Sequence, residues 1–410
     1  MNNYPFTKVR QQFESTAIAD IEQAVAHQFK SIKWRCAPGA RIAIAVGSRG
    51  IANISRIAKA VVMAVKAKGG DPFIIPAMGS HGGATAEGQR EILASYGVME
   101  EEMGCPVRSS MEVMELDNGD LEIPLFMDRH AFESDGVILI NRIKPHTAFH
   151  GDYESGLVKM SVIGLGKERL ANALHAFGIY GLKTMMPKAA RKILATGKII
   201  LGIGIVENAY DETAFIAALT PEEILRREPE LLNTAKAMMP SFPLNEIDVL
   251  VVDALGKNIS GSGMDPNIIG RMRIRGEVEP EFPAIKVIVV TDLTDASHGN
   301  ACGIGLADLV TRRLADKIDW DATYMNGITS GFYEHFMLPI VAPTDAQALE
   351  WGIRASHDPR RPKKIVRITD TLHLSEMYVS EAALKEIKDR VEILSEPENL
   401  FDEQGSLITF

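Results

Sequence analysis

The segment 41–76 reads RIAIAVGSRGIANISRIAKAVVMAVKAKGGDPFIIP, and it decides the fold class. Its first six residues form an apolar run that ends at Gly47, which predicts a buried strand. The apolar residues of 54–68 recur at helical spacing, and Gly69-Gly70 predict the end of that helix. Residues 72–76 predict a second strand. Strand, helix and strand in this order are typical of a parallel α/β sheet.

The same alternation continues on both sides of this segment. We expect a hairpin over 112–127 with a type I′ turn at Asn118-Gly119. Thr85 is expected to cap a helix that runs to residue 96, and Thr220 is expected to cap a charged helix. The other predicted helices span 18–29, 187–195, 305–318, 345–355 and 381–391. The other predicted strands span 136–140, 198–206, 213–219, 247–252, 285–290, 338–341 and 364–368.

These patterns predict an α/β fold of two α/β domains with mostly parallel, Rossmann-like sheets. At 410 residues the chain is long for a single core. The expected domains are 1–240, an N-terminal cofactor-binding domain, and 245–410, a C-terminal domain, with Pro240–Pro243 as the linker. The segment after Arg361 could pack on either domain. We expect the active site in the interdomain cleft, since ligands of α/β proteins bind at strand ends.

Composition narrows the classes of partner. The net charge of −10 argues against non-specific binding to nucleic acid or to an anionic membrane. The three cysteines are scattered without a CxxC pair, which excludes a disulfide framework and a cysteine zinc site. The N-terminus lacks the apolar core of a signal peptide, and no apolar run reaches membrane-span length. We therefore expect a cytoplasmic enzyme.

Reactive side chains follow three of the predicted strands in the first half. Arg49 follows the first strand, His81 follows the second within a glycine-rich loop, and His146 follows the strand at 136–140. Any one of these loops is more simply read as a turn. Three reactive side chains in the same topological position favour a ligand site at one edge of the sheet.

The richest stretch is 140–177, INRIKPHTAFHGDYESGLVKMSVIGLGKERLANALHAF, with His146, His150, His175 and Lys159. Imidazoles transfer protons or bind metals, and a lysine can hold a phosphate or form a covalent bond. A surface lysine and a core histidine are the ordinary alternatives. Two further readings stay open. One is a zinc hydrolase or lyase with His81, His146 and His150 as ligands. The other is a non-enzymatic binding protein for a phosphorylated small molecule.

The ordered motifs Gly79-Ser80-His81, Lys144-Pro145-His146, Ser155-Gly156-Leu157-Val158-Lys159 and His175 resemble the nickel-dependent lactate racemase family. The resemblance implies a nickel-pincer nucleotide, nickel pyridinium-3,5-bisthiocarboxylic acid mononucleotide, attached covalently to Lys159. Ser155 and Gly156 would contact this cofactor, and His175 would ligate its nickel. Cofactor-synthesis enzymes are then required for maturation.

By the same resemblance the chain would be an isomerase, a racemase or epimerase of a 2-hydroxy acid. The substrate would pass a hydride reversibly to the tethered cofactor, while His81 and His146 act as acid and base. Two histidines suit this reaction because inversion needs a base for each face. Arg49 would bind the substrate carboxylate. His150 has no role in this scheme.

The sequence departs from the family at the substrate positions. Val46 stands where the family has an aspartate, and the family's tyrosine and glutamine are absent from the segment 261–273. We therefore expect a small-molecule 2-hydroxy acid other than lactate. The candidate substrate contacts of the second domain are Lys257, Arg271, Arg273, His298 and Asn300.

Overall fold

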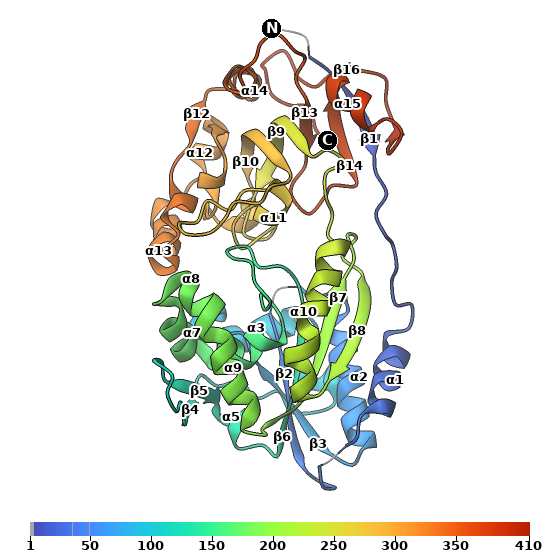
Figure 1. Cartoon of the computed structure of the whole chain (residues 1–410), viewed down its shortest axis with the longest axis vertical. Coiled ribbons are helices and arrows are strands. Elements are labelled where there is room, and N and C mark those ends of the chain that lie inside the picture. The colour runs from blue at the N-terminus through green and yellow to red at the C-terminus, as the bar shows by residue number, and fades with distance from the viewer. Residues whose placement is uncertain (1–3, 35, 49) are drawn as a thin grey trace. The chain divides into compact units, whose positions relative to one another are not determined.

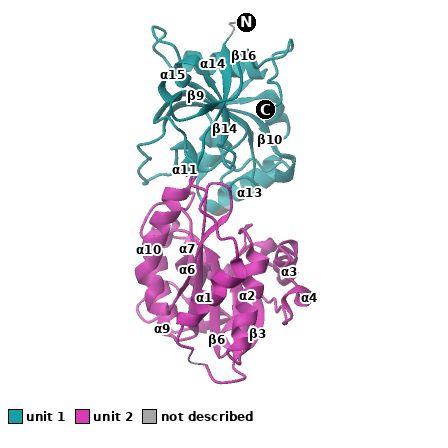
Figure 2. Cartoon of the chain, turned by 90° about the vertical axis from the view of Figure 1, so that its right-hand side faces the viewer, with its two compact units in different colours: residues 1–13, 240–410 teal, residues 14–239 magenta. Residues whose placement is uncertain are grey.

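The structure is a computed structural model that describes residues 4–34, 36–48 and 50–410. The chain forms two compact units, shown in different colours in Figure 2. Unit 1 comprises residues 1–13 and 240–410, and unit 2 comprises residues 14–239. Unit 1 therefore includes the first residues of the chain, which the sequence alone had grouped with the N-terminal domain.

Unit 2 is built on a five-stranded sheet of order β3-β2-β6-β7-β8, in which only β8 is antiparallel to its neighbour. The strands are β2 (Arg41–Val46), β3 (Asp71–Pro76), β6 (Gly136–Arg142), β7 (Ile199–Glu207) and β8 (Thr213–Leu219). A separate hairpin pairs β4 (Val113–Leu116) with β5 (Leu125–Asp128). The helices are α1 (Ile21–Ser31), α2 (Ile54–Ala67), α3 (Ala86–Ser95), α4 (Glu100–Met103), α5 (Arg129–Phe132), α6 (Leu157–Lys159), α7 (Lys167–His175), α8 (Gly178–Tyr180), α9 (Met186–Ala195) and α10 (Pro221–Met238).

Helices cover both faces of this sheet (Figure 1). Alternate residues of β7 (Leu201, Ile203 and Ile205) pack into one core with α1 and α2. The other face receives α6 and α10, which approach β7 at Gly202. A Cβ there would lie 2.8 Å from Leu157 and 2.9 Å from Ile224, so the glycine permits this close packing.

Unit 1 holds a nine-stranded sheet with the path β12-β11-β10-β9-β13-β14-β1-β15, and β16 also pairs with β1. The strands are β1 (Pro5–Arg10), β9 (Glu246–Leu255), β10 (Ala284–Leu293), β11 (Leu309–Thr311), β12 (Ile340–Ala342), β13 (Ile365–Ile368), β14 (Glu376–Ser380), β15 (Glu392–Ile393) and β16 (Glu398–Asn399). Strands β12 to β13 along this path are parallel, and the remaining pairs are antiparallel. The helices are α11 (Pro266–Ile269), α12 (Arg312–Asp316), α13 (Trp320–Ser330), α14 (Asp345–Ala355) and α15 (Glu381–Ile387).

The predicted α/β class with mostly parallel sheets is confirmed. The caps at Thr85 and Thr220 are also confirmed, the second as a complete capping box with Glu223. In the part of the chain that the structure describes, no helix is long and apolar enough to cross a membrane. The location of the active site between the two domains stays a prediction.

Three local predictions were wrong in part. The expected helix over 305–318 is instead strand β11 followed by α12, because Leu309-Val310-Thr311 is drawn into the sheet between β10 and β12. The helix expected over 381–391 ends at Ile387. The hairpin forms, but β4 and β5 pair Leu116 with Leu125, so Asn118-Gly119 is part of a longer loop rather than a two-residue turn.

Candidate functional site

Three neighbouring strand ends of unit 2 carry the residues that the sequence singled out. Strands β3, β2 and β6 are adjacent and parallel, so their carboxyl ends share one edge of the sheet. Ser48 follows β2, His81 follows β3 and His146 follows β6. Ser48 Oγ lies 2.6 Å from His81 Nδ1, which joins two of the three strand ends directly. Arg49, the expected carboxylate ligand, lies outside the described residues.

His146 is fixed by contacts to its main chain and to its ring. Its backbone N–H donates to Glu154 Oε2 at 2.7 Å. Its ring Nδ1 accepts from the backbone N–H of Ala148 at 3.1 Å, and the ring packs on Phe149 with 4.5 Å between centroids. These contacts fix the position of the ring.

Lys159 lies against the second ring nitrogen of His146. The distance from Lys159 Nζ to His146 Nε2 is 2.8 Å. The two nitrogens are therefore within hydrogen-bond distance of each other. A lysine amine is a nucleophile once it has lost its proton, and an imidazole at this distance can take that proton.

Two helices, joined by a π-helical segment and a turn, connect Lys159 to His175. Helix α6 ends at Lys159, a π-helical segment spans Met160–Gly164, and α7 ends at His175. His175 is exposed as a residue, but partial desolvation of its ring lowers its pKa, and the nearby charge of Lys159 lowers it further. Both effects favour the neutral imidazole, which is the form that binds metals.

Ser155 and Gly156, the expected cofactor contacts, stand at the start of this stretch. The backbone of Ser155 exchanges hydrogen bonds with that of Lys144 at 2.8 and 3.2 Å. The carbonyl of Gly156 accepts from the Asn141 side chain, which belongs to β6, at 2.9 Å. Both contacts fasten the segment before Lys159 to the end of β6.

Glu154 is the centre of the loop between His146 and Lys159, and it gives His150 a structural role. Its buried carboxylate receives the His146 backbone N–H and lies 2.7 Å from Lys236 Nζ and 3.4 Å from His150 Nδ1. Burial opposes ionisation of Glu154, but the hydrogen bonds from His150, Lys236 and the His146 backbone outweigh it and lower its pKa. His150 therefore helps to hold the loop that presents His146.

The sequence did not lead us to Glu228, which contacts the segment that carries Lys159. Glu228 lies on α10 and is buried, and its Oε2 accepts from the backbone N–H of Val158 at 2.9 Å. Burial raises the pKa of Glu228 to about 8 against the hydrogen bonds from Val158 and Leu157. The signal was present in the sequence, because Glu228 falls on the apolar face of α10 with Ile224 and Leu232.

The candidate substrate residues of unit 1 fall into two groups. The first group lies on the loops after β9 and β10, which are adjacent parallel strands. The backbone N–H of Lys257 donates to Ser297 Oγ at 2.9 Å, so the two loops touch. Asn300 donates from its side chain to the carbonyl of Ala322 at 3.2 Å. Lys257 and His298 are exposed.

Arg271 and Arg273 form the second group, and both are held within unit 1. Arg271 lies 2.7 Å from Asp308 and donates to the carbonyls of Leu306 and Ile285, each at 3.0 Å. Arg273 lies 2.5 Å from the other oxygen of Asp308. These contacts give both guanidinium groups a structural role within unit 1. Neither arginine is therefore part of the proposed substrate site.

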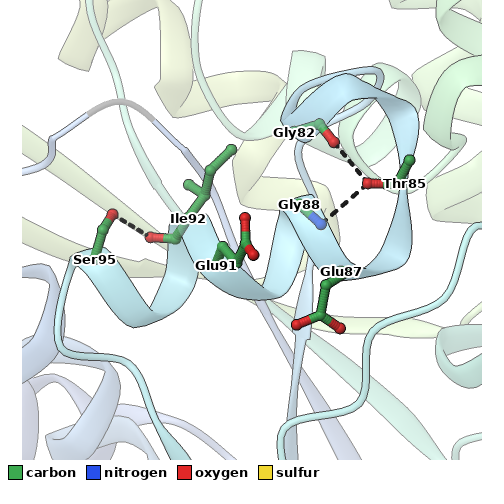
Figure 3. Close-up of a pocket in the computed structure, with 7 residues that line it drawn as sticks. All are labelled: Gly82, Thr85, Glu87, Gly88, Glu91, Ile92 and Ser95. Carbon is green, nitrogen blue, oxygen red and sulfur yellow. Dashed lines mark hydrogen bonds between the residues drawn. The ribbon is translucent and has the colours of Figure 1, made fainter.

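A surface depression lies at the start of α3, just after His81 in the chain (Figure 3). It is lined by Gly82, Thr85, Glu87, Gly88, Glu91, Ile92 and Ser95. Thr85 Oγ1 donates to the carbonyl of Gly82 and accepts from the N–H of Gly88, so its polar atoms serve the helix cap. With two glutamates and no cation among its lining residues, this depression suits no anionic substrate.

Zinc ligation was an open reading of the histidines. Among the residues that the structure describes, no group of three or more His, Cys, Asp and Glu side chains is placed to hold a metal ion. The zinc reading therefore finds no support in that part of the chain. A metal carried by a cofactor needs fewer protein ligands, and His175 remains available as one.

The fold and these contacts define a two-unit α/β protein whose reactive histidines and lysine gather at the strand ends of one sheet. Residues 6–184 match the lactate racemase N-terminal domain family. This part of the chain is thus similar to the N-terminal domain of lactate racemases.

The fold has a counterpart among solved structures. The lactate racemase apoprotein from Thermoanaerobacterium thermosaccharolyticum superposes with a TM-score of 0.51 over 89% of this chain and 93% of that chain. The two sequences are 14% identical, so this likeness concerns the fold alone. No curated protein sequence matches the chain at a significant level.

Proposed function

We propose that this protein is an isomerase that racemises or epimerises a 2-hydroxy acid other than lactate. The match of residues 6–184 to the lactate racemase N-terminal domain family supports a racemase- or epimerase-type function. The observation that carries the proposal is the placement of two histidines on either side of one strand end. His81 follows β3 and His146 follows β6, and β2 lies between those strands. A substrate carbon held at the end of β2 would meet a base on each side, as inversion requires.

The described residues also fit the family's cofactor, a nickel-pincer nucleotide. Lys159 offers an amine for covalent attachment, with the His146 ring 2.8 Å away to take its proton, and His175 offers an imidazole close enough for its pKa to respond to the charge of Lys159. When bound, this cofactor would accept and return the hydride of the substrate's α-carbon. Ser155 and Gly156, whose backbones are tied to β6, would line its position.

The chain's own residues would bind the substrate and transfer its proton. His81 and His146 would take and return the hydroxyl proton, each with its ring already oriented by Ser48 or Ala148. Arg49 would hold the substrate carboxylate as a two-pronged donor. The exposed residues Lys257 and His298, together with Asn300, would supply further contacts for a larger polar acid. A small molecule is the only partner that catalysis requires, and cofactor-synthesis enzymes would act before it.

Mass spectrometry tests the cofactor half of the proposal. The protein is produced together with the cofactor-synthesis enzymes and measured intact, and its peptides are then mapped. We expect a mass adduct on Lys159 together with nickel, and no adduct in Lys159→Ala. Protein that carries neither adduct nor nickel under these conditions would contradict the assignment. Lys68→Ala, which removes an exposed lysine of unit 2, is the control and should keep the adduct.

A screen for loss of optical purity tests the reaction. Cofactor-loaded protein is incubated with single enantiomers of 2-hydroxy acids of increasing size and polarity. We expect racemisation of at least one acid, and a fall of at least about a hundredfold in His81→Ala and in His146→Ala. Racemisation at the wild-type rate in both variants would refute the two-base assignment. Stoichiometric binding of a phosphorylated ligand without any turnover would instead favour a binding protein.

A further inference from the structure

A buried polar cluster lies behind the loop that carries His81. Lys167 and Asp128 have fully buried side chains, and Lys167 Nζ lies 3.1 Å from Asp128 Oδ2. The same Nζ donates to the carbonyl of Pro76 at 2.6 Å and to Gln89 Oε1 at 3.1 Å. Gln89 is itself buried on α3. One lysine thus joins the end of β3, helix α3 and the end of the β4–β5 hairpin.

This cluster contacts the His81 loop through Gln89. Gln89 Nε2 donates to the carbonyls of Gly79 at 2.8 Å and His81 at 3.2 Å. Its amide oxygen is taken by Lys167, so both ends of the amide are engaged and its orientation is fixed. Lys167 is also the first residue of α7, the helix that ends at His175. The cluster therefore links the main chain at His81 to the helix of His175.

Stability alone does not account for this arrangement. Moving an ion pair out of water costs several kcal/mol per ion, and well-packed apolar side chains in its place are often as stable or more so. A buried ion pair does fix geometry, because each partner must stay in place to compensate the other. The positions that this pair fixes are those of Gln89 and, through it, of His81.

We propose that Gln89 is a positioning residue for His81 and that the Lys167–Asp128 pair holds Gln89 in place. Gln89 sets the main chain on both sides of Ser80, and Ser48 Oγ sets the ring through Nδ1 at 2.6 Å. Together they direct His81 Nε2. Only the role of His81 as acid and base rests on the proposed function. The position of the His81 ring can be measured without catalysis.

The test compares two buried glutamines that make the same kind of contact. Gln11 of unit 1 donates from Nε2 to the carbonyls of Ser241 at 3.0 Å and Leu374 at 2.7 Å, and it is 7% exposed. Gln11→Met removes two donated hydrogen bonds, and Gln89→Met removes the same kind of pair together with the hydrogen bond that Gln89 accepts from Lys167. Gln89→Glu is a second variant, which keeps an oxygen for Lys167 while removing both donors. Thermal unfolding of each variant establishes that it is folded.

The first readout is the His81 ring in cofactor-free protein. Ring resonances are followed by NMR with ¹³C-labelled histidine, and the rate of His81 carbethoxylation is followed by peptide mass spectrometry. We expect shifted or broadened His81 signals and a several-fold change in carbethoxylation rate in both Gln89 variants. We expect wild-type values for His81 in Gln11→Met. Wild-type His81 signals and rates in a folded Gln89 variant would overturn the proposal.

The second readout is racemisation by cofactor-loaded protein. A displacement of about 1 Å at a catalytic group costs about a hundredfold in rate, and we expect a kcat loss of that order in the Gln89 variants. If the wild type racemises no 2-hydroxy acid but the Gln89 variants still alter the His81 ring, the proposed function fails and the positioning role stands. If the wild type is active and the Gln89 variants match it in both readouts, the positioning role fails.

Discussion

Glu228→Gln is the substitution whose effect can best be worked out from the structure. Glu228 is buried on α10 beneath the stretch that carries Lys159, and its Oε1 has no hydrogen-bond partner among the described residues. Burial raises its pKa to about 8, so the folded protein keeps this carboxyl protonated at neutral pH. Glutamine has nearly the same shape, remains neutral at every pH and still offers an oxygen to the Val158 N–H.

The size and sign of the effect follow from the pKa. In the unfolded chain Glu228 ionises at its ordinary value of 4.5, whereas in the folded chain it ionises at about 8. Between those pH values the folded state holds one proton more, so the free energy of unfolding falls as pH rises. At about 1.4 kcal/mol per pH unit, the fall amounts to about 5 kcal/mol. The free energy of unfolding of the glutamine variant does not fall in this way. It should therefore exceed the wild-type value by an amount that grows as pH rises between those two values.

Tryptophan fluorescence offers a way to follow unit 2 by itself. The chain has three tryptophans, and only Trp34 belongs to unit 2. In a background with Trp320→Phe and Trp351→Phe, urea unfolding is measured from pH 5 to pH 9. We expect the variant to gain about 4 kcal/mol on its parent across that range. Glu230→Gln, on the exposed side of the same helix, is the control and should stay parallel to the parent. Parallel curves for Glu228→Gln as well would refute the raised pKa.

Three further predictions concern unit 2. Thr220→Ala removes the capping box of α10 and should cost about 1 kcal/mol of unfolding free energy in the same urea assay; no loss would contradict the cap. Lys236→Met removes a partner that lowers the pKa of Glu154. Ionised Glu154 stabilises the folded protein, and this stability is lost as pH falls through the folded-state pKa of Glu154. Because Lys236→Met raises that pKa, the variant should unfold in acid at a higher midpoint pH than the wild type. An unchanged midpoint would exclude the effect. In cofactor-free protein, His146→Ala should change the rate at which an amine-selective reagent labels Lys159, because Lys159 Nζ lies 2.8 Å from His146 Nε2. An unchanged labelling rate by peptide mass spectrometry would argue against this contact.

Only part of the candidate site could be predicted from the sequence. Reactive residues directly after buried strands could be placed at one sheet edge, because parallel strands end on the same side. The sequence could not show that His146 contacts Lys159 or that Ser48 contacts His81, since each pair is joined by side chains from separate segments. His150 had no assigned role until its contact with Glu154 was known.

Most of the site contacts that the sequence did not predict involve buried charged residues. Lys167 looks in the sequence like an ordinary surface residue, because charged side chains are rarely buried. Lys167 is buried only because Asp128, Gln89 and the carbonyl of Pro76 converge on its ammonium group. Those partners are far apart in the chain, so no local pattern reveals them.

The sequence by itself determined the features that depend on neighbours in the chain. The strand, helix and strand of 41–76 follow from apolar periodicity, and the cap at Thr220 follows from hydrogen bonds across one helical turn. Tertiary structure decided the rest. Strand β1 pairs Phe6 with Ser380, and Leu309-Val310-Thr311 becomes a strand only because β10 and β12 flank it. Strand pairing satisfies backbone groups with a distant partner, so the partner must be in place before the local conformation is fixed.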